Sequence, residues 1–425
     1  MKNFYIKTLG CKTNQLENEI IRNSLIKAGY SEAQEIELAD FYILNSCAVT
    51  ENATNDSLYF LKNIKRKFPR IKTVLTGCVA QLGEVKNSEF VDIVVGNNEK
   101  LSIAEFLDKT NNYFVEDIFE LKEFNNKIIS SNTRTRGNLK IQDGCNNRCS
   151  YCTIPYARGN SRSNTIENII EQINVYTQSA VNEVILTGIH IGQWGVDFKS
   201  PKTLLDLLKE IEKTDIKRYR LGSLDPLEIS NEMIEFLKSS EKFCQLFHIS
   251  IQSVCDKTLK NMNRKYNAQI VLEKIEQLKE AFVFPFLGCD IIVGFPDETE
   301  EDFQECYENL QKSGLTKIHV FPYSIRKNTP AALMQGQVPL EIKKQRAELI
   351  KKISTEKFDN FLTTNLNSYQ EVQVNKKIDK NTGYYKGLTR NYLNVFIDSE
   401  VDISNKILNV KITSRQGDDL FGKIM

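Results

Sequence analysis

The chain of 425 residues is about 2.8 times as long as a typical domain of ~150 residues, which predicts two or three domains. Its 56 Lys and Arg against 55 Asp and Glu exclude a strongly basic nucleic-acid binder, but not a local basic patch. A hydrophobic fraction of 41% and a charged fraction of 26% are those of a globular protein. No apolar run approaches the ~20 residues that span a bilayer, and the first residues lack a signal peptide's apolar core. We therefore expect a cytoplasmic protein with no membrane partner.

Strand and helix patterns alternate over the first hundred residues. Apolar runs predict buried strands, and the segments between them repeat apolar residues every three or four positions, as amphipathic helices do. Such alternation is typical of a parallel sheet, so we expect a Rossmann-like α/β domain over residues 1–115. The periodicity is then lost and Asn, Ser and Thr accumulate, which predicts a linker over residues 116–134. The predicted strands cover residues 4–9, 41–44, 72–75 and 91–95.

Six further strand patterns, separated by amphipathic helices, occupy residues 135–354. Because a closed TIM barrel needs eight βα units, six predict a partial, open (βα)6 barrel of the TIM type, with its chemistry at the carboxyl ends of the strands. Residues 355–425 hold short alternating runs broken by Asn, Gly and Asp, which predict a small antiparallel β-barrel. The barrel strands are expected at residues 138–144, 183–189, 218–224, 246–252, 288–296 and 317–324, and the later strands at 368–375, 392–398 and 407–414.

The cysteines carry the clearest chemical signal. Stable disulfides are rare in the cytoplasm, so ten cysteines beside three histidines indicate thiolate metal sites, catalysis or buried thiols. Cys145, Cys149 and Cys152 lie in one loop after a predicted strand, and three such thiolates can hold one iron–sulfur cluster that leaves an iron open for a cofactor. Tyr151 would shield one side of this cluster. The alternatives are chance clustering and a zinc knuckle, for which no fourth ligand lies nearby.

A second set of cysteines is dispersed along the N-terminal domain. Cys11, Cys47 and Cys78 each end a predicted strand and precede a helix, at spacings of 36 and 31 residues. Because the carboxyl ends of parallel strands share one edge of a sheet, we expect the three thiols to converge there as a second cluster site. The alternative is three unrelated buried thiols, since Cys is often buried. The remaining four cysteines follow no such pattern and are interpreted as structural: Cys244, Cys255, Cys289 and Cys306.

With these motifs in hand, the chain resembles the methylthiotransferases of the radical S-adenosylmethionine (SAM) superfamily over essentially its whole length. The three regions resemble the family's auxiliary-cluster domain, its radical SAM partial barrel and a TRAM domain. Within the family, the residues around the cysteines are most similar to the branch that acts on threonylcarbamoyladenosine in tRNA. The motifs that carry the resemblance are GCKTNQLENE, NSCAVTENA, IQDGCNNRCSYCTIPYARG and HVFPYSIRKNTPA.

The resemblance implies a radical mechanism with two 4Fe–4S clusters and two molecules of SAM. The cluster on Cys145, Cys149 and Cys152 would bind and reductively cleave SAM to methionine and a 5′-deoxyadenosyl radical, while the protein orients the reactants. The cluster on Cys11, Cys47 and Cys78 would hold or relay the sulfur that another SAM methylates. The acceptor would be carbon 2 of N6-threonylcarbamoyladenosine-37, next to the tRNA anticodon.

The resemblance also implies cofactor contacts at the ends of successive barrel strands. Thr187 and Gly188 would face the methionine moiety, and Ile292 and Gly294 would flank the adenine. For each of these positions the alternative is a residue that merely lines the barrel. Asn14 and Gln15 would support the auxiliary cluster indirectly, by contacting the residues around its ligands rather than the cluster itself. The expected SAM-binding residues are Tyr151, Thr187, Gly188, Ser223, Gln252, Ile292 and Gly294.

Two histidines and one motif carry weaker signals. His190 and His248 are expected to pack or to support other groups rather than to bind metal. The motif LGSLDP has Gly222 and Asp225 where the resemblance leads us to expect Ser and Glu, which puts that SAM or substrate contact in doubt.

RNA contacts are expected on the C-terminal barrel, because small β-barrels bind RNA through exposed aromatic residues. The alternative is an ordinary solvated surface of mixed charge. Trp194, the only Trp, could stack a base or pack its own loop. Residues 66–68 and 261–266 could add phosphate contacts. The expected RNA-binding residues are Tyr385, Arg390, Tyr392 and Lys411, with Tyr384 as a further contact.

The implied partners are the anticodon stem-loop of tRNA, an electron donor such as flavodoxin or ferredoxin, and a sulfur donor. Two alternatives keep the chemistry and change the substrate, to isopentenyladenosine in tRNA or to a ribosomal protein. An alternative of another class is an iron–sulfur RNA-binding regulator. That alternative predicts RNA affinity that depends on the clusters, without reductive cleavage of SAM.

Overall fold

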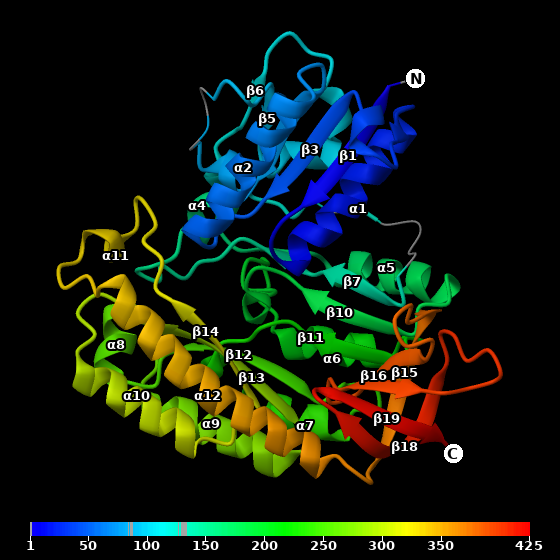
Figure 1. Ribbon diagram of the computed structural model, residues 1–425, viewed down its shortest axis with the longest axis vertical. Coiled ribbons are helices and arrows are strands. Elements are labelled where there is room, and N and C mark those ends of the chain that lie inside the picture. The colour runs from blue at the N-terminus through cyan, green and yellow to red at the C-terminus, as the bar shows by residue number, and fades with distance from the viewer. Residues whose placement is uncertain (1, 84, 86–87, 126, 129–133) are drawn as a thin grey trace.

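A computed structural model describes residues 2–83, 85, 88–125, 127–128 and 134–425. Figure 1 shows the chain as an N-terminal α/β region above a central barrel, with the C-terminal barrel packed beside the central one. Of the linker predicted over residues 116–134, residues 126 and 129–133 lie outside the described residues. The rest of that segment includes a short 3-10 turn, Ile118–Glu120. Among the described helices, none combines the length and the apolar character needed to cross a lipid bilayer.

The N-terminal sheet has six parallel strands in the order β2-β1-β3-β4-β5-β6. The four strands predicted here are present as β1, β3, β4 and β5, and two short strands, β2 and β6, extend the edges. Separate apolar clusters cover the two faces, which is why the central strand β3 is buried along its whole length. The strands are β1 (Asn3–Thr8), β2 (Ser31–Glu32), β3 (Phe41–Ser46), β4 (Lys72–Gly77), β5 (Ile93–Val95) and β6 (Tyr113–Phe114); the helices are α1 (Lys12–Lys27), α2 (Glu51–Lys67) and α3 (Cys78–Gln81).

The central region is a partial barrel of six parallel strands, as the sequence predicts. Two three-stranded sheets, β7-β10-β11 and β12-β13-β14, are joined by isolated bridges from Tyr219 to Phe243 and from Leu224 to Ile249. Helices cover the outside and bury one large apolar core against the strands. The strands are β7 (Arg136–Lys140), β10 (Glu183–Thr187), β11 (Arg218–Leu221), β12 (Leu246–Gln252), β13 (Phe286–Val293) and β14 (Lys317–Pro322); the longer helices are α5 (Ile166–Gln178), α6 (Leu204–Glu212), α7 (Asn231–Ser239), α9 (Ala268–Ala281) and α10 (Glu300–Lys312).

The central region also contains several short elements, and one long helix connects it to the C-terminal barrel. Helix α12 (Leu340–Thr364) packs along β14 and then ends on the core of the C-terminal barrel, so the predicted boundary at residue 354 falls inside a continuous helix. The short elements are β8 (Gln142–Asp143), β9 (Arg162–Ser163), α4 (Ile154–Arg158), α8 (Asp256–Asn261) and α11 (Pro330–Leu333).

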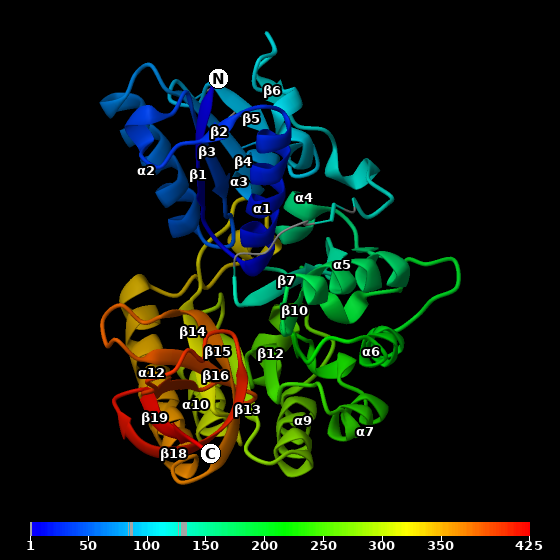
Figure 2. The same ribbon diagram turned by 90° about the vertical axis from the view of Figure 1, so that its right-hand side faces the viewer.

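The C-terminal region is a closed five-stranded barrel in the order β15-β16-β17-β19-β18. Three of its strands were predicted, and β16 and β19 were not. Its pairings are antiparallel except that β17 and β19 run parallel, which differs from the purely antiparallel barrel expected. Figure 2 shows this barrel in front of β12–β14 of the central barrel. The strands are β15 (Tyr369–Ile378), β16 (Tyr385–Thr389), β17 (Asn394–Ile397), β18 (Ile407–Gln416) and β19 (Asp419–Ile424).

Candidate active site

The thiols of Cys11, Cys47 and Cys78 meet at the carboxyl edge of the N-terminal sheet. Cys11 lies between β1 and α1, Cys47 follows β3, and Cys78 begins α3 directly after β4. All three line one cavity of about 720 Å³, which the central and C-terminal barrels also enclose. The structure therefore brings together the three dispersed cysteines, and their role as cluster ligands stays a prediction.

Two glycines allow the loops that carry these thiols to approach one another. Gly10 and Gly77 have left-handed φ values of +95° and +91°, which L side chains rarely adopt. A Cβ atom on Gly10 would lie 2.7 Å from Cβ of Cys47, and one on Gly77 would clash with the carbonyl oxygen of Ser46. Glycine at these two turns is therefore a packing requirement of the cysteine site.

The second set, Cys145, Cys149 and Cys152, lies on the loop between β8 and α4. Hydrogen bonds hold this loop from both ends: the Cys145 amide donates to the carbonyl of Gly159 at 3.0 Å, and the Cys152 amide donates to the carbonyl of Cys149 at 3.1 Å. The thiols of Cys149 and Cys145 lie close to that of Cys152, whose pKa is raised by burial and, in addition, by these two neighbours. One loop thus presents three cysteines as a group.

Both sets fit iron–sulfur clusters better than single metal ions. Within the described residues, no three or more His, Cys, Asp or Glu side chains converge on a single ion. Thiolates that bind different irons of one cluster need not converge on a point. Burial raises the pKa of Cys47 to about 11 and that of Cys152 to about 12, because a lone thiolate is poorly solvated there. A bound metal would supply the positive charge that stabilises such thiolates.

Two side chains that the sequence reasoning did not single out as ligand partners contact the cysteine loop. Arg264 donates to the sulfur of Cys149 at 3.3 Å and to a carboxylate oxygen of Asp225 at 2.7 Å. The shorter acid at position 225 therefore still reaches a cationic partner. His190 lies 3.4 Å from the sulfur of Cys145 and 2.5 Å from Glu228. Although burial alone would lower it, the hydrogen bonds to Cys145 and Glu228 raise the pKa of His190 to about 10.

The expected SAM contacts separate into two groups. Thr187, Gly188 and Ser223 line the 720 Å³ cavity, beside the strand ends where the motif places them. The turn after β10 is fixed by the Gln142 side chain, whose carbonyl accepts hydrogen bonds from the amides of Ile189 and His190 at 3.1 and 2.8 Å.

The second group lies around β12 and β13. Tyr151 and Ile292 pack in a small apolar cluster with Phe295. Gln252 and Gly294 have left-handed φ values of +71° and +67°. For Gln252 this conformation is strained, and such strain is often concentrated at functional sites. The cofactor roles of both groups stay predictions.

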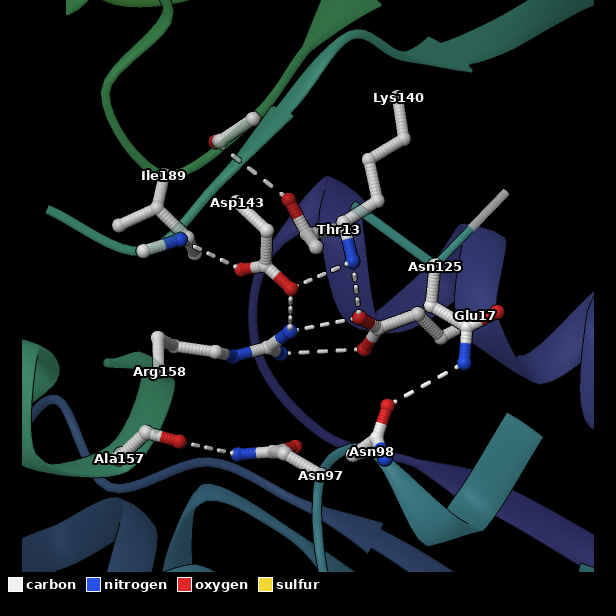
Figure 3. Close-up of polar contacts among 12 residues, drawn as sticks. Thr13, Glu17, Asn97, Asn98, Asn125, Lys140, Asp143, Ala157, Arg158 and Ile189 are labelled. Carbon is white, nitrogen blue, oxygen red and sulfur yellow. Dashed lines mark hydrogen bonds and ion pairs between the residues drawn. The ribbon is translucent and has the colours of Figure 1, made fainter. Parts of the chain in front are cut away.

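A buried charge network connects the N-terminal domain to the cysteine loop (Figure 3). Glu17 on α1, only 1% exposed, makes ion pairs with Lys100 at 2.6 Å, Lys140 at 2.8 Å and Arg158 at 2.6 Å. Arg158 is the last residue of α4, which begins two residues after Cys152. Its partner Glu17 lies 141 positions earlier in the chain and in a different domain, so no local pattern predicts the network.

Asn14 extends this network to the auxiliary cysteines. Its side-chain amide donates to the carbonyls of Leu9 and Ser46, two and one residues before Cys11 and Cys47, and its carbonyl accepts a hydrogen bond from Arg158 at 2.6 Å. Asn14 therefore contacts the backbone next to Cys11 and Cys47, and its role in supporting a cluster stays a prediction. Gln15 is exposed, and its side-chain carbonyl accepts a hydrogen bond from Arg134 instead.

The expected RNA contacts are only partly on the surface. Tyr385 is 8% exposed and packs in the core of the C-terminal barrel, which argues against stacking by this ring. Arg390 is bound to Glu371 at 2.8 Å. Tyr392 is 41% exposed and lines the cavity, with its ring 5.5 Å from the guanidinium of Arg220.

Lys411 and Trp194 are two further nucleic-acid candidates. Lys411 lies 5.8 Å from the ring of Tyr369 on the outer face of the C-terminal barrel. Trp194 is buried and donates to the carbonyl of Asn164 at 2.8 Å, so it packs its own loop.

Comparison with known proteins gives matches to both large regions. The radical SAM superfamily matches residues 139–310, and the uncharacterized protein family UPF0004 matches residues 3–96. A solved radical SAM methyltransferase, TsrM from Kitasatospora setae, aligns with a TM-score of 0.58 at 12% identity and covers 78% of this chain and 77% of its own. At this identity the likeness establishes the fold alone.

Relatives of known name align over nearly the full length. Threonylcarbamoyladenosine tRNA methylthiotransferase MtaB of Bacillus subtilis is 34% identical over 95% of this chain and 92% of its own. MtaB of Aquifex aeolicus is 34% identical over 92% of this chain and 95% of its own. The tRNA-2-methylthio-N(6)-dimethylallyladenosine synthase of Lachnoclostridium phytofermentans is 33% identical over 99% of this chain and 95% of its own.

The partial barrel and its three-cysteine loop define a radical SAM enzyme, a class that implies SAM and a 4Fe–4S cluster. With the N-terminal domain and full-length relatives added, the chain belongs to the radical SAM methylthiotransferase family.

Proposed function

We propose that this enzyme transfers a methylthio group to carbon 2 of N6-threonylcarbamoyladenosine-37 in tRNA, using two 4Fe–4S clusters and two molecules of SAM. The observation that carries the proposal is the shared cavity of about 720 Å³. One wall bears Cys11, Cys47 and Cys78, and another bears the strand ends at Thr187 and Ser223. A cavity lined both by the proposed sulfur site and by residues proposed to contact SAM suits a reaction that needs both at the same carbon.

The chain's own residues hold, orient and enclose the reactants. Cys145, Cys149 and Cys152 would bind one cluster and the other three cysteines the second. When bound, the clusters and SAM supply reductive SAM cleavage and the sulfur that is transferred. The network of Glu17 and Arg158 fixes the two cysteine sites relative to each other.

The proposed partners are the tRNA anticodon stem-loop, an electron donor such as flavodoxin or ferredoxin, and a sulfur donor. The established names of the MtaB relatives support threonylcarbamoyladenosine as the substrate. On the C-terminal barrel, Tyr384, Tyr392 and Lys411 are the residues we propose for contacts with the RNA. Tyr392 is the one of these that reaches the cavity.

Nucleoside analysis tests the substrate. Total tRNA from a strain that lacks this gene is digested and compared with tRNA from the parent and the complemented strain by mass spectrometry. We expect the methylthio derivative of threonylcarbamoyladenosine to disappear in the deletion strain and to return on complementation. If it persists in the deletion strain, the proposed substrate is wrong.

A second candidate keeps the reaction and changes the substrate to N6-dimethylallyladenosine. It is favoured by relatives of that name, which align over 99% of this chain at 32–33% identity. The same digest distinguishes the two substrates, because this candidate predicts loss of the methylthio derivative of dimethylallyladenosine instead.

A further inference from the structure

One wall of the shared cavity carries polar side chains from β12, β13 and β14. Neither the cysteine sites nor the strand ends expected to contact SAM account for these polar groups. Alternate residues of β12, β13 and β14 face the cavity, since successive side chains of a strand point to opposite faces. Their neighbours in sequence, among them Ile249, Cys289 and Ile318, lie in the apolar core on the other face. The cavity-facing residues are His248 and Ser250 from β12, Asp290 from β13, and Lys317 and His319 from β14.

The charges on this wall are incompletely matched. Asp290 and His248 are paired, with 3.0 Å between the carboxylate and the imidazole. Lys317 is half-buried and makes no ion pair with any carboxylate of the described residues. Its ammonium lies 3.8 Å from the centre of the Phe358 ring, a contact that leaves it free to bind an anion as well. An anionic ligand group in the cavity would supply the missing partner.

We propose that this polar wall binds the N6 substituent of the substrate base, and that Lys317 pairs with its carboxylate and so selects it. The proposal rests on the proposed function, which gives the substituent. A threonylcarbamoyl group carries a carboxylate, a hydroxyl and a urea, all of which hydrogen-bond. A dimethylallyl group carries none of these, and it would leave the polar side chains of the wall unpaired. A site built to hydrogen-bond its substrate rejects an analogue that lacks those groups far more strongly than an apolar pocket can.

A structural role for Lys317 makes a different prediction. If the side chain only packs against Phe358 on α12, its replacement should affect every substrate equally. If it pairs with the substrate, the effect should depend on the charge of the substituent. Comparing substrates of different charge on one protein variant therefore separates the two roles.

The experiment uses the full-length, anaerobically reconstituted enzyme and three anticodon stem-loops. These carry threonylcarbamoyladenosine, its carboxylate methyl ester, or dimethylallyladenosine at position 37. Methylthiolation gives kcat/KM, and fluorescence anisotropy gives Kd. The variants are Lys317→Met, which keeps the apolar stem, and Lys317→Arg, which keeps the charge. Lys238→Met removes an exposed lysine of α7 that pairs with Glu235, and it serves as the control.

We expect Lys317→Met to lower kcat/KM for the acid by about tenfold to hundredfold, the value of a hydrogen bond to a charged group. The same variant should leave the ester nearly unchanged, Lys317→Arg should retain most activity on the acid, and Lys238→Met should behave as wild type. Cleavage of SAM in the absence of RNA should not change. Equal losses on acid and ester, or no loss on the acid, would overturn the role of Lys317.

The wild-type enzyme provides a test that does not depend on how the variant folds. Its kcat/KM for the acid should exceed that for the ester by about the same factor. A ratio near one overturns the inference while leaving the proposed function standing. Activity on the dimethylallyl stem-loop, with none on the threonylcarbamoyl one, would instead contradict the proposed function itself.

Discussion

At the scale of single residues, Glu17 is the side chain on which the junction of two domains depends. It is buried, and cations from three separate elements surround it: Lys100, Lys140 and Arg158. Removal of one partner from a buried ion pair costs far more than the pair contributes, because the other charges stay buried without compensation. Glu17 has three such partners, so the loss of its charge should lower the stability of the fold most.

We therefore expect Glu17→Gln to lower the free energy of unfolding by about 3–5 kcal/mol. Thermal unfolding of iron-free protein at pH 7 measures the effect as a lower melting temperature. Glu232→Gln is the matched control, because Glu232 is largely exposed and pairs with Lys209 at the surface. Its effect should stay within about 0.5 kcal/mol. Equal effects of the two substitutions would show that the buried network does not stabilise the fold.

The same carboxylate predicts how stability depends on pH. Although burial alone would raise it, the neighbouring cations Arg158, Lys100 and Lys140 hold the pKa of Glu17 well below the ordinary value of 4.5. A lowered pKa in the folded state means that the carboxylate stabilises the fold fully above the ordinary value, and that this contribution is lost as the pH falls through the lower, folded value. The difference in melting temperature between wild type and Glu17→Gln should therefore be constant near neutral pH and shrink below about pH 4.5. A difference that grows on acidification would contradict the assignment.

At the scale of elements, the turns between strands and cysteines determine whether the auxiliary site can form. Gly77 combines a left-handed φ with backbone of β3 directly where a side chain would begin. Gly29 has a similar φ of +89° but open space around it. An alanine at either position would be strained by its left-handed φ. Only at Gly77 would its Cβ atom also clash with neighbouring backbone.

We expect Gly77→Ala to displace Cys78 and to remove about half of the iron that the reconstituted protein binds, since one of two clusters would be lost. Gly29→Ala should be destabilised mildly by its conformation and keep its full iron content. Iron and sulfide analysis, together with the visible absorption spectrum, measures both. Full iron content in Gly77→Ala would mean that the close approach of β3 and β4 is not needed for the cluster.

Most strands with apolar patterns could be predicted from the sequence, whereas two strands of the C-terminal barrel with a glycine near the middle could not. The prediction for β12 matches its observed bounds, because hydrophobic and polar side chains alternate from Phe247 to Gln252. β16 and β19 each contain a glycine in the middle, Gly387 and Gly422. The missing Cβ atoms make room for Val372 and Val410 of the neighbouring strands, so the residues that break the pattern are those that let the barrel pack.

The candidate site, too, could be predicted from the sequence only in part. Sequence spacing could predict that Cys11, Cys47 and Cys78 converge, because the ends of parallel strands share an edge. It could not predict Arg158, Arg264 or the polar wall with Lys317. Their partners are distant in sequence, and their importance comes from burial, which appears only when the domains are packed together. Tyr385 illustrates the opposite case, since the sequence alone did not tell that its ring is buried in the core of the C-terminal barrel.

At the scale of the whole molecule, three domains share one cavity. The N-terminal domain contributes the auxiliary cysteines, the central barrel the strand ends and the polar wall, and the C-terminal barrel Tyr392. The left-handed φ of Tyr392, +69°, and the hydrogen bonds from Arg220 to the carbonyls of Thr389 and Arg390 hold this turn of the C-terminal barrel against the central barrel. We therefore assign separate tasks to the two cysteine sets: sulfur supply to Cys11, Cys47 and Cys78, which line the cavity, and SAM cleavage to the set on the loop between β8 and α4, which does not line it.

The most direct test of this central claim is to disable one cysteine set at a time and to measure two products together. Reconstituted protein is incubated with dithionite, SAM and tRNA that carries threonylcarbamoyladenosine, and both 5′-deoxyadenosine and the methylthio nucleoside are quantified. Cys145→Ala should form neither product. Cys47→Ala should still form 5′-deoxyadenosine while methylthiolation is abolished. If Cys47→Ala loses both products although its Cys145 cluster is intact, or if it still methylthiolates the tRNA, the assignment of two tasks to two cysteine sets is wrong.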